Sequence, residues 1–94
     1  MKGPSVISKN DRETIIGCAR KFKVGSVFLF GSSLDKSAQA RDIDIGIKGI
    51  NPRDFFKFYG ELIKNLSKPV DVVDLSGESR FNKLVEEKGV NILG

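Results

Sequence analysis

The chain has 94 residues, a length that predicts one domain spanning residues 1–94. It carries a formal net charge of +4 and contains no His and a single Cys. These counts exclude Ser-His-Asp and Cys-His catalysis, His-ligated zinc and an intramolecular disulfide. Val, Ile, Leu and Phe together number 31, which favours a folded core over disorder. Any chemistry must therefore come from carboxylates, amines, hydroxyls and bound metal ions.

The charge is distributed unevenly along the chain. Residues 1–41 have a net charge of +5 and residues 42–94 a net charge of −1. This asymmetry is typical either of an ordinary solvated surface or of a face that attracts phosphate. No apolar run reaches the roughly 18 residues of a membrane span, and no signal peptide is visible. We therefore expect a cytoplasmic protein with no membrane partner.

The first part of the chain predicts one helix and one strand. Asn10 followed by Glu13 resembles a helix start, with an N-cap and its partner three residues on. Apolar residues then recur at helical spacing as far as Phe22. Cys18 lies among them, so we expect a core thiol rather than a reactive one. Residues 26–30 form a short apolar run that suits a buried strand.

The rest of the chain begins with the clearest strand pattern. Ile43, Ile45 and Ile47 alternate with Asp42, Asp44 and Gly46, which predicts a strand with one apolar face and one acidic face. The remaining elements follow in order: an amphipathic helix from Asn51-Pro52 to before Pro69, a strand over 70–75, a short helix from Ser79 to Gly89, and a tail of uncertain form over 90–93.

This order of elements predicts an α/β (α+β) fold, with a small mixed sheet of about three strands and helices packed mainly on one face. The second and third strands are joined through a helix, so we expect them to be parallel with a right-handed crossover. The connection between the first and second strands is compatible with either direction.

The acidic side chains are the sharpest chemical signal. Asp42 and Asp44 lie on one strand face, roughly 7 Å apart, where two carboxylates repel each other. A divalent cation such as Mg²⁺ removes that conflict, whereas a solvated edge strand is the plainer explanation. Asp71 interrupts an otherwise apolar strand and is favoured as a third carboxylate. Asp74 has the opposite parity and stands before a turn, where Asp commonly bonds the backbone.

A second signal directly follows the first predicted strand. Gly31 allows a ligand to approach the backbone closely, and the next amides can face an anion such as a triphosphate. Ser32 adds a hydroxyl donor. An ordinary strand-to-turn Gly-Ser is the plainer explanation, and the sequence contains no P-loop.

Together these segments resemble a known family. Leu29-Phe30-Gly31-Ser32, then Asp42-Ile43-Asp44-Ile45 after nine residues, and later Val70-Asp71-Val72-Val73 resemble the minimal nucleotidyltransferases of the DNA polymerase β superfamily. Such proteins are often encoded beside a HEPN-domain partner as toxin–antitoxin pairs. The resemblance covers almost the whole chain and implies a single minimal nucleotidyltransferase domain.

The resemblance implies a role for each motif. Asp42, Asp44 and Asp71 would be the catalytic, metal-binding carboxylates for two Mg²⁺ ions. The nucleotide, ATP, would be held by a set of five residues: Gly31, Ser32, Ser33, Lys36 and Arg41. AMP would pass from ATP to a hydroxyl on a HEPN toxin, and the protein would be its antitoxin. A nucleic acid acceptor is open but not indicated.

The sequence also departs from the family pattern. Many members have Arg-Gly shortly after Gly-Ser, and a Ser just before the first Asp. Here Asp35-Lys36 and Arg41 occupy those places. Asp35 brings a negative charge near the expected phosphate site, and Lys36 or Arg41 can supply the missing cation.

Two other functions compete with this one. A Toprim-like domain also uses Asp-x-Asp with Mg²⁺, but it needs a glutamate where this chain has Phe30-Gly31-Ser32. A catalytically silent module with the same fold would neutralise a partner by masking it. Phe56 and Tyr59 lie toward an edge of their predicted helix, where they form either an interface or part of a wide buried stripe.

Overall fold

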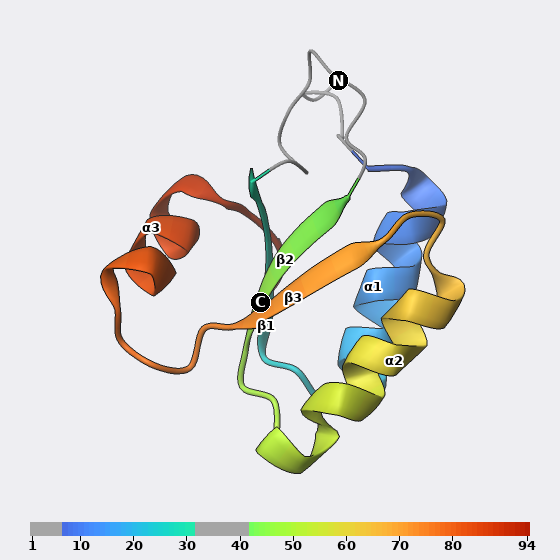
Figure 1. Ribbon diagram of the computed structural model, residues 1–94, viewed down its shortest axis with the longest axis horizontal. Helices are drawn as coiled ribbons and strands as arrows, with labels where there is room; N and C mark the ends of the chain where they lie inside the picture. The colour runs from blue at the N-terminus through green and yellow to red at the C-terminus, as the bar shows by residue number, and fades with distance from the viewer. Residues whose placement is uncertain (1–6, 32–41) are drawn as a thin grey trace.

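The computed structural model describes residues 7–31 and 42–94, and Figure 1 shows their arrangement. The predicted order of helices and strands is confirmed, and the predicted tail forms one more strand. The elements are α1 (Lys9–Lys21), β1 (Ser26–Phe30), β2 (Ile43–Lys48), the short 3₁₀ helix η2 (Pro52–Asp54), α2 (Phe55–Asn65), β3 (Val70–Asp74), α3 (Arg80–Lys88) and β4 (Val90–Leu93).

The described strands form a mixed sheet in the order β3-β2-β1-β4. β2 and β3 are parallel, as the intervening helix predicts, and β1 runs antiparallel to β2, which settles the direction that the sequence left open. β4 pairs antiparallel with β1. Within the described residues the sheet therefore has four strands rather than about three, and β3 lies at one edge.

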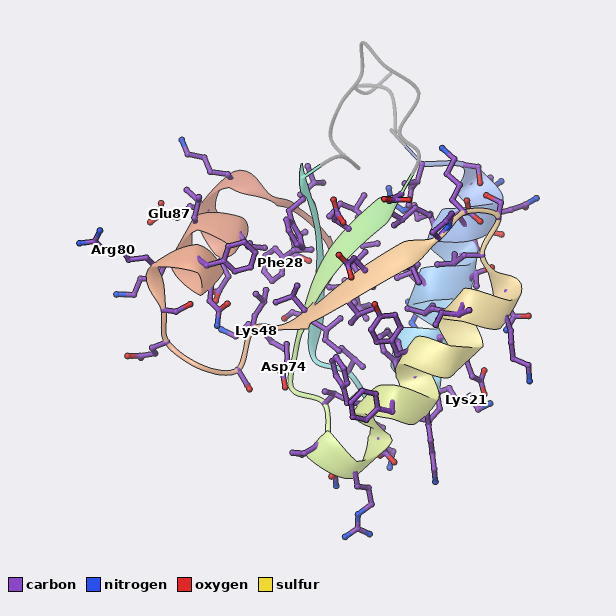
Figure 2. The ribbon with its side chains drawn as sticks, in the orientation of Figure 1. Lys21, Phe28, Lys48, Asp74, Arg80 and Glu87 are labelled. Atoms are coloured by element: carbon purple, nitrogen blue, oxygen red, sulfur yellow. The ribbon has the colours of Figure 1, made fainter. Side chains whose placement is uncertain are left out.

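Helices cover both faces of the sheet (Figure 1), and each face has its own apolar core. Ile43, Ile45 and Ile47 of β2 are fully buried in a large apolar cluster that includes residues of α1 and α2. On the opposite face, α3 contributes Val85 to a small cluster. Phe28 of β1 belongs to that cluster and points toward α3 in Figure 2. The prediction of helices mainly on one face is confirmed for α1 and α2, while α3 covers the other face.

The start of α1 differs from the prediction. Ser8, not Asn10, is the N-cap, because its hydroxyl accepts a hydrogen bond of 3.1 Å from the amide of Asp11. Asp11 is itself buried, and its carboxylate accepts hydrogen bonds from the amide and the hydroxyl of Ser67. This carboxylate therefore ties the first turn of α1 to the segment between α2 and β3.

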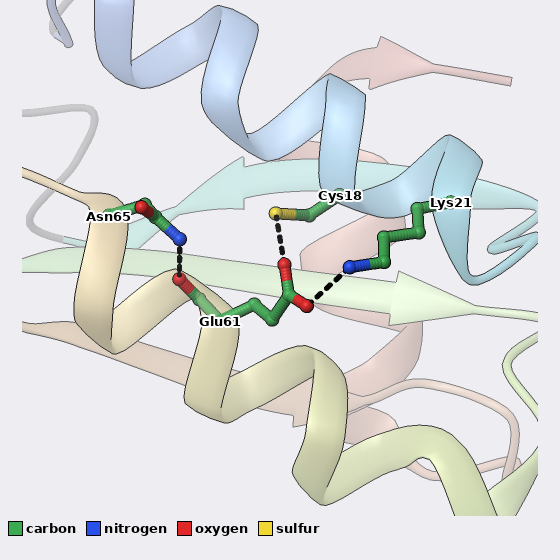
Figure 3. A network of polar contacts seen from close by, with 4 residues as sticks. All are labelled: Cys18, Lys21, Glu61 and Asn65. Atoms are coloured by element: carbon green, nitrogen blue, oxygen red, sulfur yellow. Dashed lines mark hydrogen bonds and ion pairs between the residues drawn. The ribbon is translucent and has the colours of Figure 1, made fainter.

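A second polar contact joins α1 to α2 (Figure 3). The Glu61 carboxylate forms an ion pair with Lys21 and lies 4.0 Å from the Cys18 sulfur. Cys18 is buried, as the helical spacing predicts. Burial, and then the Glu61 charge, raise the pKa of the thiol, while Lys21 opposes them. The sole cysteine is therefore a neutral core residue.

Candidate active site

The acidic positions meet on the α3 face of the sheet, at the β2/β3 junction. Asp44 of β2 and Asp71 of β3 are partners in the parallel register, so their side chains leave the same face of neighbouring strands. Asp42 precedes β2 by one residue and has the same parity as Asp44. Asp42 and Asp71 are exposed and Asp44 is half-buried. A ligand can therefore reach this face from solvent.

Gly31 packs directly against this acidic face. Its φ angle is +59°, in the left-handed region that favours glycine. A Cβ atom at this position would lie 2.6 Å from Oδ2 of Asp44. Phe30, the preceding residue, pairs with Asp44 in the antiparallel β1/β2 ladder. The absence of a side chain at Gly31 is thus what lets the β1 end and the Asp44 carboxylate lie together.

The structure separates Asp71 from Asp74 as the parity argument predicts. Asp74 pairs with Ile47, which belongs to the other face of the sheet. Its Oδ1 accepts a hydrogen bond of 2.9 Å from the amide of Ser76, and the residue lies where β3 ends (Figure 2). Asp74 is therefore the last residue of β3 and accepts a hydrogen bond from the turn that follows, and Asp71 is the β3 carboxylate that shares a face with Asp44.

One polar neighbour of Asp71 was missed in the sequence. The hydroxyl of Tyr59, on α2, lies 3.1 Å from Oδ1 of Asp71 and 3.2 Å from the carbonyl oxygen of Val70. Burial raises the pKa of the Tyr59 phenol; the Val72 amide lowers it, and the Asp71 carboxylate raises it. One feature of the sequence indicates such a contact: Tyr59 places a hydroxyl on the apolar stripe of the helix that connects to β3.

The carboxylates of this face are ligands of the kind that a hard cation prefers, but their side chains are not grouped around one point. Carboxylate oxygens are the ligands that Mg²⁺ prefers, and Gly31 leaves room beside Asp44. Within residues 7–31 and 42–94, however, no three Cys, Asp or Glu side chains are grouped so that they could hold a metal ion. Asp44 and Asp71 fit the expected site by register, while the Asp71 carboxylate is engaged by Tyr59.

Most of the predicted nucleotide-binding residues are not among the described residues. Ser32, Ser33, Lys36 and Arg41 lie outside the described residues, and so does Asp35. Only Gly31 of that set is described. In the described part of the chain, every helix is too short or too polar to cross a membrane.

A family model described as "Polymerase beta, Nucleotidyltransferase" matches residues 13–94, which include the acidic strand and β3. The chain belongs to this nucleotidyltransferase family. The family resemblance and the α/β fold that the sequence predicts are both confirmed. No curated protein matches the chain.

Three solved structures show the same fold. The chain is 22% identical to a chain of the toxin–antitoxin MntA-HepT, with a TM-score of 0.69, over 93% of this chain and 73% of that one. It is 24% identical to a chain of a toxin–antitoxin with AMP-PNP, with a TM-score of 0.67, over 88% and 73%. It is also 24% identical to a chain of the tri-AMPylated Shewanella oneidensis HEPN toxin in complex with MNT antitoxin, with a TM-score of 0.68, over 89% and 70%.

Proposed function

We propose that this nucleotidyltransferase-fold chain is an active enzyme that transfers AMP from ATP to a hydroxyl on a partner protein. The observation that carries the proposal is the pairing of Asp44 with Asp71 on one face, with Gly31 packed against Asp44. Membership of the nucleotidyltransferase family supports it. Two Mg²⁺ ions and ATP are the cofactor and donor that this assignment requires.

The proposed roles follow the positions of the carboxylates. Asp42, Asp44 and Asp71 would hold the metal ions, which would neutralise the charge of the triphosphate. Gly31 leaves the β1 end open to the phosphates. The acceptor oxygen forms a bond to the α-phosphorus as the bond to the bridging oxygen breaks, so pyrophosphate leaves and AMP stays on the acceptor. Asp71 receives the proton of the attacking hydroxyl. None of these steps needs an imidazole.

The proposed partner is a HEPN toxin, which would make this chain its antitoxin. Three similar structures support this assignment: MntA in complex with HepT, a toxin–antitoxin with AMP-PNP, and an MNT antitoxin with a tri-AMPylated HEPN toxin. The described fold consists of one small sheet and its helices, with little surface left to grip an acceptor. A partner protein that binds beside the acidic face would supply the acceptor hydroxyl itself.

A second candidate function is binding without catalysis. Phe56 on α2 is 79% exposed, so this ring is on the surface rather than in a wide buried stripe. It lines a groove of about 500 Å³ together with Phe22, Lys57 and Lys64. An exposed aromatic side chain beside a groove favours a protein interface, which a masking module also requires.

One experiment separates these two functions. The purified chain is incubated with Mg²⁺, ATP labelled on the α-phosphate, and the protein encoded beside it. We expect the label on the partner, and no label when Asp42→Asn and Asp44→Asn are combined. That double variant should fold with unchanged or slightly higher stability, since like-charge repulsion is relieved. A tight complex that acquires no label would establish masking instead.

The β3 carboxylates give a sharper form of the test. Asp71→Asn should lower the transfer rate about 100-fold or more, as expected for a lost general base. Asp74→Asn is the matched control on the same strand and should keep the rate. Initial rates of labelled transfer measure both variants. The reverse ranking would show that the wrong β3 carboxylate has been assigned.

A further inference from the structure

Tyr59 is the only tyrosine of the chain, and its hydroxyl bridges two acceptors at the edge of the sheet. It lies 3.1 Å from Oδ1 of Asp71 and 3.2 Å from the Val70 carbonyl oxygen. A phenol has one proton to donate, so the two acceptors share it. The Asp71 carboxylate is therefore held by a bond that has an alternative acceptor beside it.

The direction of this contact is what makes it unusual. Asp71 leaves β3 on the face that it shares with Asp44, whereas α2 packs on the opposite face over the isoleucines of β2. Since β3 is an edge strand, the Tyr59 hydroxyl reaches the carboxylate around that edge. The contact ties the Asp71 carboxylate to α2, the helix that packs on the opposite face of the sheet. This agrees with the finding that no three acidic side chains are gathered in the described residues.

We infer that Tyr59 is a positioning residue that holds the Asp71 carboxylate at the sheet edge until a divalent cation takes it. The inference rests on the proposed function, since it assigns Asp71 to a metal site with Asp44. The exchange costs little free energy, because the Tyr59 hydroxyl can donate its hydrogen bond to the Val70 carbonyl oxygen when Asp71 binds the cation. No polar group then loses all its partners. Tyr59 thus sets the metal affinity of the site.

The first test uses Mn²⁺ alone as the probe and the full chain. Electron paramagnetic resonance measures the concentration of free Mn²⁺ as protein is added. Tyr59→Phe keeps the ring and removes the competing donor, so it should bind Mn²⁺ about 3- to 10-fold more tightly, the equivalent of one net hydrogen bond. Asp74→Asn is the matched control and should bind as the unaltered chain does. Equal or weaker binding by Tyr59→Phe overturns the inference.

A second readout needs no change at Tyr59. The chain has no Trp, so its tyrosine emission comes from this residue alone. A carboxylate that accepts a hydrogen bond from the phenol quenches this emission, so saturating Mg²⁺ should raise the emission intensity. Asp71→Asn should start brighter and respond less. If Mg²⁺ does not change the emission intensity of the unaltered chain, the inference is contradicted, even if Tyr59→Phe fails to fold.

The two proposals fail in different ways. If the unaltered chain binds no Mn²⁺, or if the Asp42→Asn, Asp44→Asn double variant binds it equally well, the metal site itself is wrong and both proposals fall. If the double variant loses Mn²⁺ while Tyr59→Phe binds as the unaltered chain does, only the inference falls. In that case Tyr59 is simply a cap for the Val70 carbonyl.

Discussion

The two faces of the sheet differ in composition, since one is apolar and the other carries the acidic side chains. The face under α1 and α2 presents Ile43, Ile45 and Ile47 to a continuous apolar core, and all three are fully buried. The α3 face presents Asp44 and Gly46 from the same strand. One strand of six residues thus supplies the largest core and the acidic face, because its side chains alternate.

This difference teaches where stability and chemistry can be altered independently. Among the described residues, the α3 face has a small apolar cluster around Phe28, Leu75 and Val85, so most of their hydrophobic stabilisation comes from the other face. Carboxylates can therefore be placed on one face while the apolar core of the other face stabilises the fold.

The strongest test of the comparison is a truncation on the core face. Phe58 of α2 is fully buried, so Phe58→Ala should lower the free energy of unfolding by about 3–5 kcal/mol. Phe56→Ala is the matched control on the same helix. Because Phe56 is exposed, this variant should change stability by no more than about 0.5 kcal/mol. Urea denaturation measures both, and equal losses would contradict the assigned faces.

A smaller effect is expected from overpacking the α3 face. A Cβ atom at Gly46 would lie 2.6 Å from Cδ1 and 2.9 Å from Cγ of Leu75. Gly46→Ala should therefore cost about 1–3 kcal/mol, because Leu75 has to shift. Gly60→Ala is the control, since a Cβ there meets nothing within 4 Å. Thermal unfolding compares the two variants, and a stabilised Gly46→Ala would show that Leu75 is not tightly packed.

The smallest effect concerns the Cys18 thiol in the helix layer. Because burial raises its pKa, Cys18 should react much more slowly with iodoacetamide in the folded chain than in urea at pH 8. Its contribution to stability is fully present below the pKa of an unfolded cysteine and is lost as pH rises through the higher folded pKa. Mass spectrometry follows the alkylation, and equal rates would place the thiol on the surface.

The alternation of β2 allowed much of the candidate site to be predicted. Once Ile43, Ile45 and Ile47 are assigned to the core, parity puts Asp42 and Asp44 on the other side. The parallel crossover then makes β3 the neighbour of β2, and parity favours Asp71 over Asp74. Local periodicity and one topological rule were sufficient for this part of the fold.

Two of the missed features depend on contacts distant in the sequence. β4 has two exposed residues among its four and shows no alternation, and its pairing partner is β1, about sixty residues earlier. The Tyr59 contact requires α2 to sit over the edge of β3, which no spacing along the helix reports. The N-cap differs from these two cases, because the Ser8 hydroxyl accepts from the Asp11 amide three residues on, which is a local contact.

The edge position of β3 also decides how another chain can approach. Pro69 before the strand has no amide hydrogen, Asp71 and Asp74 bring charge to the strand, and the Tyr59 hydroxyl already occupies the Val70 carbonyl. A visiting strand would have to displace that hydroxyl and meet two carboxylates. These features disfavour the addition of another strand at this edge of the sheet.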